Sequence, residues 1–228
     1  MIIFYKNYKR TDRTFLSIQS VKHLFPDIDI RCLFLYDNDP SEYDSEIKIF
    51  KSLGVTCYLD KKTYNFKNLS GAGSALNGYY FTEGINKIYN IIKDNNNKVL
   101  ILDEDSYFTN GDTINFLLSN KFDLGWAYWK CPSSGAIKYP NRDIGINGSI
   151  LAINPKKLNK YFPIPEVKEY IEYLLGFELY DKCLNDGLSV VKIPTRLYND
   201  YCGDGTHTND KEVIIRDLTK NKITFKEL

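Results

Sequence analysis

The chain has 228 residues, of which 43% are hydrophobic and 26% charged, and its formal net charge is +1. This composition fits one large globular domain, and the near-zero charge excludes a bulk attraction to nucleic acid or to an anionic membrane. No apolar run is long enough to span a membrane, and the first strand lacks the flanks of a signal peptide. Five scattered cysteines favour a reducing environment over a disulfide framework, so we expect a cytoplasmic protein.

The first part of the chain alternates between the patterns of strands and helices. Short apolar runs predict strands, whereas apolar residues that recur every three or four positions predict helices. Pro26 ends the first helix, and Gly54 stands where a helix C-cap favours glycine. This alternation implies right-handed crossovers and a parallel sheet. The predicted strands are residues 2–5, 29–36 and 55–59, and the predicted helices are residues 15–24, 41–53 and 75–93.

One mid-chain strand ends in three carboxylates. Residues 99–102 read Val-Leu-Ile-Leu, which is typical of a strand buried on both faces, and Asp103-Glu104-Asp105 follows directly. In an open α/β sheet, ligands bind beyond the carboxyl ends of the strands. The triplet is therefore either an acidic turn or a site for a hard divalent cation bound through oxygen atoms.

The second part of the chain mixes short elements with long loops. Asn154-Pro155 places a proline in the first turn of a predicted helix, and Gly187 is a predicted C-cap. No linker rich in Pro, Gly or Ser divides the chain, so we predict a single domain over residues 1–228. The other predicted elements are strands at residues 122–128, 144–153 and 188–193 and helices at residues 114–118, 166–175 and 178–185.

The strand that leads into Leu102-Asp103-Glu104-Asp105 resembles the DxD signature of the GT-A fold glycosyltransferases. Three further segments are similar to that superfamily and follow its order: residues 3–10, residues 176–194 and His207. The resemblance implies one GT-A-like α/β domain, with a Rossmann-like, mixed but mostly parallel central sheet flanked by helices. It also implies that residues 1–110 form a nucleotide-sugar-binding half, and residues 111–228 an acceptor-binding half with a C-terminal tail.

The same resemblance implies a metal-dependent transferase of the hexosyltransferase type. Its partners would be a nucleotide-sugar donor, with a UDP-sugar favoured, and a glycan or other hydroxyl acceptor. A divalent cation, Mn²⁺ or Mg²⁺, would offset the charge of the leaving diphosphate. The candidate metal ligands are Asp103, Asp105 and His207, and Asp103 would also contact the ribose.

Further candidate residues would bind the nucleotide-sugar. Asp37 ends the second predicted strand and can accept hydrogen bonds from the base or ribose, while basic residues near the first strand can bind phosphate. The candidate donor-binding residues are Tyr5, Lys6, Arg10, Arg13, Asp37, Asp103, Glu104, Asn147 and Gly148.

An inverting transfer also needs a base that takes the proton of the acceptor hydroxyl. Glu178 and Asp181 lie three positions apart and would share one face of a predicted helix, so each is a candidate. Solvation on an exposed helix face is the alternative interpretation of both carboxylates. The sequence leaves open whether the configuration of the sugar is kept or inverted.

Three other function classes remain open. A phosphatase of the haloacid dehalogenase type also has Asp-x-Asp after a strand, but near the N-terminus and with Thr or Val where this chain has Tyr107. A nucleotidyltransferase would need a glycine-rich loop after the first strand, and residues 6–13 contain no glycine. A non-catalytic glycan-binding module would share the fold and show no donor turnover.

Overall fold

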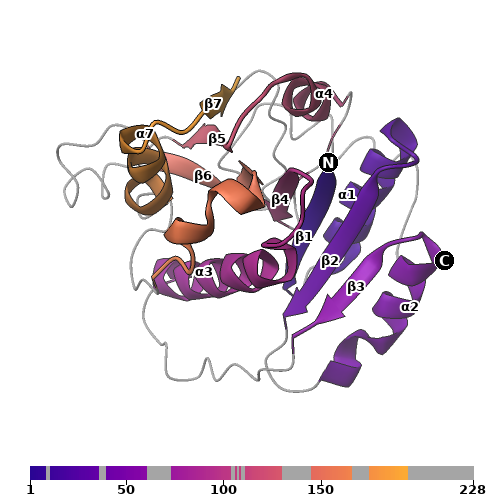
Figure 1. Ribbon diagram of the computed structural model, residues 1–228. Coiled ribbons are helices and arrows are strands. Elements are labelled where there is room, and N and C mark those ends of the chain that lie inside the picture. Colours follow the sequence, from indigo (N-terminus) through magenta and orange to yellow (C-terminus); the bar gives the residue numbers. More distant parts are fainter. Residues whose placement is uncertain are drawn as a thin grey trace.

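The computed structural model describes residues 1–8, 11–35, 40–60, 73–103, 106, 108, 111–129, 145–165 and 175–194. Over these residues the chain forms three layers, with one seven-stranded sheet between two layers of helices (Figure 1). This is the single mixed α/β domain that the sequence predicts. None of the helices within the described ranges combines the length and apolarity that crossing a bilayer requires.

The sheet is mixed but mostly parallel, with strand order β3-β2-β1-β4-β6-β5-β7. Among the described strands, β6 alone runs against the others, because it pairs antiparallel with both β4 and β5 while all other neighbours pair in parallel. The carboxyl ends of β1, β2 and β4 therefore meet at one edge. The strands are Ile2–Tyr8 (β1), Asp29–Leu35 (β2), Thr56–Leu59 (β3), Val99–Asp103 (β4), Leu124–Trp129 (β5), Gly145–Ile153 (β6) and Val190–Ile193 (β7).

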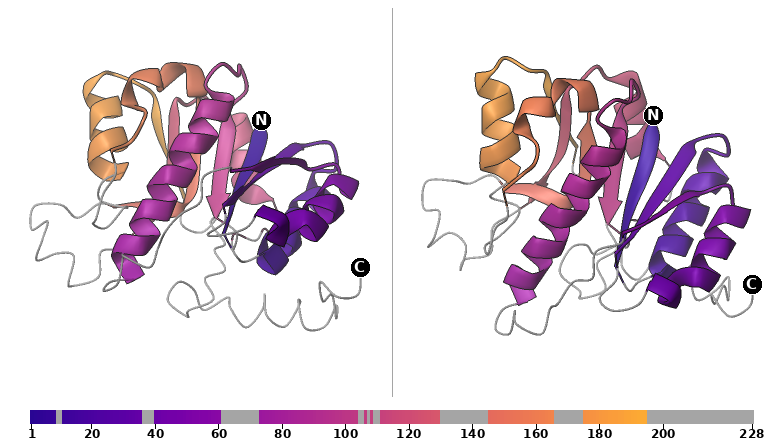
Figure 2. Two further views of the ribbon diagram at one scale, coloured as in Figure 1. Left: turned by 90° about the horizontal axis from the view of Figure 1, so that it is seen from below. Right: turned by 60° about the horizontal axis from the view of Figure 1, so that its bottom comes forward.

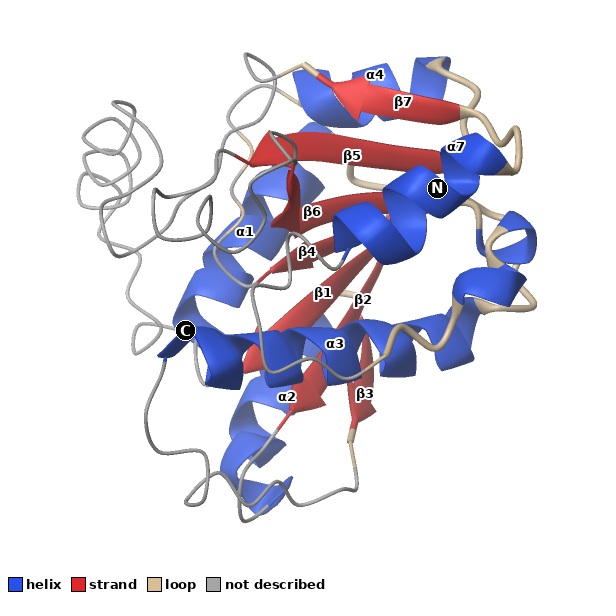
Figure 3. Cartoon of the chain, turned by 90° about the vertical axis from the view of Figure 1, so that its left-hand side faces the viewer, coloured by secondary structure: helices blue, strands red, loops and turns tan. Residues whose placement is uncertain are grey.

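Helices cover both faces of the sheet (Figures 2 and 3). One face packs against α3 (Gly73–Ile92), a π-helical turn (Gly176–Asp181) and α7 (Lys182–Asn185). The other face packs against α1 (Thr11–Leu24), α2 (Asp44–Ser52) and α4 (Asp112–Ser119). Short 3₁₀ turns lie at Pro40–Tyr43, Pro155–Lys157 and Asn159–Tyr161.

Alternation along the central strands divides the core into two clusters. Ile2 and Phe4 of β1 lie in the cluster under α3, whereas Ile3 and Tyr5 lie in the cluster under α1. In β4, Val99 and Ile101 share the α3 side, and Leu100 and Leu102 share the α1 side. Successive side chains of a strand point to opposite faces, so strands with helices on both faces are apolar throughout. This explains the unbroken apolar runs in the sequence.

The segment after β6 differs from the prediction. Asn154-Pro155 does not begin an α-helix, because over the described residues 155–165 the chain forms two 3₁₀ turns. Tertiary contacts fix the segment in this irregular path: the side-chain amide of Asn86 in α3 donates to the Ile164 carbonyl at 2.8 Å and accepts from the Ile164 N–H at 2.8 Å. Such contacts override a weak local helix preference.

Three described glycines have left-handed backbone conformations that favour glycine, and the first of them, Gly54 with φ = 75°, confirms the predicted C-cap after α2. Gly111, before α4, has φ = 72°, and a Cβ placed on it would lie 2.7 Å from a ring carbon of Phe25. Gly187, after α7, has φ = 70° with nothing within 4 Å of a Cβ. The predicted C-cap at Gly187 is thus confirmed by its left-handed backbone.

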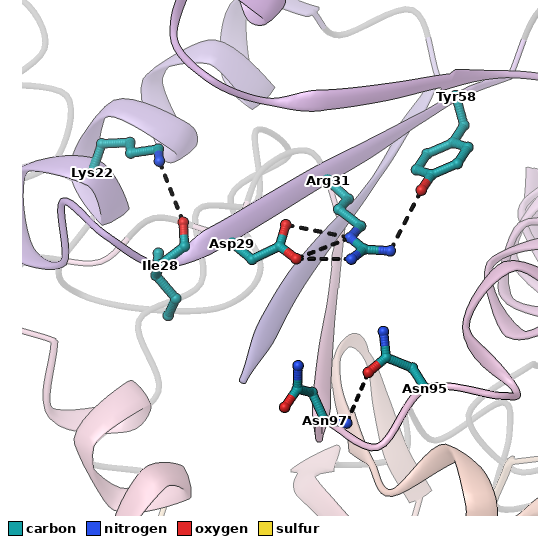
Figure 4. Close-up of polar contacts among 7 residues, drawn as sticks. All are labelled: Lys22, Ile28, Asp29, Arg31, Tyr58, Asn95 and Asn97. Carbon is teal, nitrogen blue, oxygen red and sulfur yellow. Dashed lines mark hydrogen bonds and ion pairs between the residues drawn. The ribbon is translucent and has the colours of Figure 1, made fainter.

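Polar contacts at the amino end of β2 tie the strands to their flanking loops (Figure 4). Arg31 donates to both carboxylate oxygens of Asp29 and, at 3.4 Å, to the Tyr58 hydroxyl. Lys22, near the end of α1, donates to the Ile28 carbonyl at 3.3 Å. Asp27-Ile28-Asp29, which also has an Asp-x-Asp pattern, therefore lies at the edge of the sheet opposite to Asp103, where Asp29 pairs with Arg31.

Candidate functional site

The candidate site begins with two charged residues on neighbouring central strands. Lys6 of β1 and Asp103 of β4 are partners in the parallel register. Lys6 lies two residues after Phe4, and Asp103 two residues after Ile101, so each shares a face of the sheet with that apolar residue. Both side chains therefore point to the face that α3 covers. The structure thus brings together a predicted donor-binding lysine and a predicted metal ligand at the carboxyl edge of the sheet.

The Lys6 ammonium and the Asp103 carboxylate form an ion pair through Nζ and Oδ1. The lysine side chain is 7% exposed and the aspartate side chain 22%. A charge in so dry a place needs a partner, and breaking a fully buried pair costs about 3–5 kcal/mol. The ion pair therefore belongs to the stable structure and also places two chemically useful groups at the edge.

Helix α3 leaves room for the lysine through a glycine. A Cβ placed on Gly84 would lie 2.6 Å from Cδ and 2.9 Å from Cγ of Lys6, and 3.3 Å from a methyl carbon of Leu35. Contacts under 3.0 Å require a neighbour to move. The lysine stem therefore lies directly against the backbone of α3, and only glycine at this position permits that approach.

Two serines of α1 hold the segment that follows the carboxylates. The Ser17 hydroxyl donates to the carbonyl oxygen of Ser106, and the hydroxyl of fully buried Tyr5 lies 2.8 Å from Ser17 Oγ. Since the one hydroxyl proton of Ser17 goes to a carbonyl, Tyr5 donates to Ser17. Ser20 Oγ accepts the Phe108 N–H at 3.3 Å. The chain just beyond the DxD triplet is thus anchored to α1.

The connection from β1 to α1 is short and also anchored. Asn7 is fully buried, and its side-chain amide donates to Thr11 Oγ1 at 3.3 Å and accepts from Thr14 Oγ1 at 3.2 Å. Only residues 9–10 separate the end of β1 from the start of α1. Arg13 follows in α1, so the candidate phosphate-binding residue lies in the helix that begins at this connection.

A second charged group lies on the same side of the sheet. Asp60 follows β3, is 7% exposed and forms an ion pair with Lys87 of α3, which also lies 3.8 Å from Glu83. These contacts fix the position of α3 over the carboxyl ends of the outer strands. Lys87 of α3 is therefore a second lysine on this face of the sheet, and its carboxylate partners differ from that of Lys6.

The two candidate bases lie on the π-helical turn on the α3 face of the sheet. Glu178 forms an ion pair with Lys182, and its side chain is 25% exposed. Asp181 is partly buried at the end of the turn. Tyr180 packs edge-to-face on Trp126 of β5, with ring centroids 5.0 Å apart. Because β6 joins β5 to β4, this turn covers the strands next to the one that carries Asp103.

The remaining candidates divide into placed residues and residues outside the described ranges. Asn147 and Gly148 lie in β6 before Ile150, which pairs with Leu102 near the end of β4. The Tyr5 ring is fully buried on the α1 side, and its main chain lies in the middle of the sheet between Cys32 of β2 and Leu102 of β4. Burial also raises the pKa of the Tyr5 hydroxyl, which stays protonated. Outside the described residues lie Arg10, Asp37, Glu104, Asp105 and His207.

The one candidate metal ligand that the structure describes, Asp103, fits a divalent cation in part. Of the three candidate ligands only Asp103 is described, and the described residues include no group of three His, Cys, Asp or Glu side chains placed to hold a metal ion. A carboxylate at the carboxyl edge suits Mn²⁺ or Mg²⁺. One of its oxygens is paired with Lys6, so a cation there has to share this carboxylate with an ammonium group.

Solved structures with this arrangement of elements include sugar and nucleotide transferases. A galactosyltransferase LgtC, in complex with donor and acceptor sugar analogues, matches over 86% of this chain and 74% of its own, with a TM-score of 0.55 and 16% identity. A mannosyltransferase from Pyrobaculum calidifontis, in complex with GDP-Man and Mn²⁺, matches over 90% and 58%, with a TM-score of 0.56 and 10% identity. The chain has the GT-A fold.

Solved structures that match this chain also include an enzyme that transfers nucleotides. An inositol-1-phosphate CTP transferase from T. maritima matches over 98% of this chain and 97% of its own, with a TM-score of 0.55 and 12% identity. No family model and no curated protein matches the sequence. At these identities the likeness establishes the GT-A fold, and the reaction has to be argued from the residues.

Sequence reasoning missed the residues that support the site. Ser17 and Ser20 stand among the apolar positions of α1, where their buried polar role has no signature of its own. Gly84 did carry a signal, because an isolated glycine inside a helical pattern often marks a close approach of another group. The approaching group, Lys6, is identified only by the fold.

Proposed function

We propose that this protein is a metal-dependent glycosyltransferase that moves a sugar from a nucleotide-diphosphate sugar, with a UDP-sugar favoured, to a glycan or other hydroxyl acceptor. The observation that carries the proposal is the Lys6–Asp103 pair at the carboxyl edge of a GT-A sheet, directly before Glu104-Asp105. A diphosphate leaving group needs positive charge, and this edge supplies a lysine together with carboxylates that can hold a cation.

The proposed donor site lies in residues 1–110. Lys6, Arg10 and Arg13 bind the phosphates, since ammonium and guanidinium groups form strong charge-assisted hydrogen bonds with them. Asp37 and Glu104 line the nucleoside, and Asp103 contacts the ribose and the cation. When bound, Mn²⁺ or Mg²⁺ at Asp103, Asp105 and His207 supplies charge that stabilises the departing diphosphate.

The proposed acceptor site lies in residues 111–228. Asn147 and Gly148 of β6 contact the donor sugar. In an inverting transfer, Glu178 or Asp181 accepts the proton of the acceptor hydroxyl while its oxygen bonds to the anomeric carbon and the diphosphate leaves with the electron pair of the broken bond. The π-helical turn supports this role, since such turns are frequent at functional sites.

The test measures donor turnover and metal-dependent donor binding. We expect Mn²⁺ with one member of a panel of UDP-, GDP- and CDP-sugars to raise the thermal unfolding midpoint and to give slow donor hydrolysis. Asp105→Asn should abolish both effects without unfolding the protein, because a carboxamide is a poor ligand for the cation. Asp27→Asn is the matched control, since it changes an Asp-x-Asp triplet at the opposite edge of the sheet. Full donor turnover by Asp105→Asn would refute the metal assignment.

A second variant pair tests the base. Glu178→Gln and Asp181→Asn should keep donor binding, and the variant that lacks the base should lose turnover. Retention of full turnover by both would mean that another group takes the proton. An absence of thermal shift and of hydrolysis with every donor would remove the transferase proposal and favour a glycan-binding module.

Nucleotidyl transfer is the second candidate, because the T. maritima CTP transferase matches nearly the whole of both chains. The short connection of residues 9–10 between β1 and α1 argues against it, since it leaves no room for a glycine-rich nucleotide loop. Release of pyrophosphate from a nucleoside triphosphate and a sugar phosphate would identify that activity. We expect none.

A further inference from the structure

We propose that Lys6 and the divalent cation use the Asp103 carboxylate in turn. Without nucleotide, the Lys6 ammonium occupies the carboxylate. When a nucleoside diphosphate binds, Lys6 turns to its phosphates and the cation takes the released carboxylate oxygen. The inference rests on the proposed function, because it assumes that a cation and a diphosphate meet at this edge. Its consequence is that metal and nucleotide bind cooperatively and that Lys6 carries the coupling.

The first support is the position of the ion pair. Lys6 and Asp103 are register partners on adjacent strands, point to the same face and are in contact. The lysine side chain is 7% exposed, so water contributes little to its solvation. The Asp103 carboxylate pairs with the Lys6 ammonium and compensates its charge.

The second support is the fixed stem of the lysine. The backbone of α3 at Gly84 lies directly against Cγ and Cδ of Lys6 and limits their movement on that side. The ammonium can therefore swing only about the last bonds of the side chain. Such a short movement takes it from the carboxylate to a phosphate placed beyond the strand ends, without any change in the backbone.

The third support is charge. An ammonium and a divalent cation within about 4 Å of each other repel strongly in a partly dry site. One carboxylate shared by both cannot offset that repulsion. A diphosphate adds several negative charges at the same place, which lets both cations stay. The nucleotide thus changes Lys6 from a competitor of the cation into a second positive partner of the phosphates.

The experiment measures Mn²⁺ affinity directly, from the electron paramagnetic resonance signal of free Mn²⁺, with and without UDP or GDP. In Lys6→Met an apolar side chain of similar length fills the space beside Gly84 and removes the charge. We expect Mn²⁺ without nucleotide to bind this variant about tenfold or more tightly than the natural protein, within the usual range of coupling between two ligands. The gain in Mn²⁺ affinity on adding nucleotide should shrink by a similar factor.

The matched control is Lys87→Met. Lys87 lies on α3 at the same face but pairs with Asp60 and Glu83, so its loss should leave Mn²⁺ affinity unchanged. Gly84→Ala is the second variant. The added methyl group displaces the Lys6 stem, so this variant should also bind Mn²⁺ more tightly without nucleotide. It keeps the test decisive if Lys6→Met fails to fold, which circular dichroism would reveal.

Unchanged Mn²⁺ affinity in folded Lys6→Met or Gly84→Ala would overturn the inference, and so would weaker binding. The outcome is independent of transfer activity. Tighter Mn²⁺ binding in Lys6→Met together with no turnover of any nucleotide-sugar would support the shared carboxylate and refute the proposed reaction. Turnover with unchanged Mn²⁺ affinity would refute the shared carboxylate and leave the reaction in place.

Discussion

The hydrogen-bonded chain from Tyr5 through Ser17 to Ser106 makes a quantitative prediction. Ser17→Ala removes the acceptor of the fully buried Tyr5 hydroxyl and the donor to the Ser106 carbonyl. Tyr5→Phe removes only the first of these bonds, because Ser17 still donates to Ser106. The two substitutions therefore have different costs although they act on the same hydrogen-bonded chain.

The magnitudes follow from what each substitution leaves behind. In Ser17→Ala, a buried hydroxyl without its partner costs about 1–3 kcal/mol, and loss of the bond to the carbonyl adds about 1 kcal/mol. In Tyr5→Phe, loss of one hydrogen bond costs about 0.5–1.5 kcal/mol. The double variant has no stranded Tyr5 hydroxyl, so we expect it to be more stable than Ser17→Ala alone by about 1 kcal/mol.

The assay is equilibrium unfolding in guanidinium chloride, followed by far-ultraviolet circular dichroism. Midpoints compared at a common slope give the free-energy differences, and the natural protein should have enough stability for all three variants to fold. If adding Tyr5→Phe to Ser17→Ala destabilised the protein further by the full cost of the single change, the two side chains would not be coupled and the Tyr5–Ser17 hydrogen bond would be refuted.

Two further predictions concern positions away from the site. Gly111→Ala should destabilise the protein by about 2–5 kcal/mol, because it adds a clash with the Phe25 ring to the strain of a left-handed backbone. Gly187→Ala should cost only the backbone strain of about 1–2 kcal/mol. Thermal or denaturant unfolding compares the two variants, and equal losses of stability would contradict the clash. Hydrogen bonds from Lys160 and Tyr161 hold the pKa of Asp186 below its ordinary value of 3.8. A carboxyl group whose pKa is lower in the folded state stabilises the fold at pH values above its unfolded pKa, and this stabilisation is lost as the pH falls through the folded pKa. The stability advantage of the natural protein over Asp186→Asn should therefore vanish in acid unfolding curves. A difference that persists when both states are protonated would contradict this.

The central strands could be predicted because strands that are buried on both faces consist of apolar residues throughout. Residues 99–102 are apolar throughout since both faces of β4 are covered, and the structure places β4 at Val99–Asp103. β1 extends beyond the predicted residues 2–5 to Tyr8. Its polar end escaped prediction because Lys6 pairs with Asp103, far along the chain, and because Asn7 is buried through bonds to Thr11 and Thr14 that form only once α1 folds back onto the strand.

Strand order could not be predicted from local patterns. Nothing in the composition of β6 says that it inserts antiparallel between β4 and β5, because that choice depends on contacts between residues far apart in the chain. At the site, the prediction identified Asp103 from its place after a buried strand and Lys6 from a basic stretch. The roles of all the candidate site residues stay predictions, both those the structure describes, Lys6 and Asp103 among them, and those outside the described ranges.

The pairing of Lys6 with Asp103 also disfavours a wrong register between β1 and β4 during folding. A slip of β4 by one residue along β1 would turn the Asp103 side chain to the other face of the sheet and leave Lys6 facing an apolar neighbour. Such a slip would strand two charges in a dry interior, which no repacking of aliphatic side chains can offset. The same two groups that we assign to donor binding therefore also discriminate the correct alignment of the central strands from its nearest misaligned alternatives.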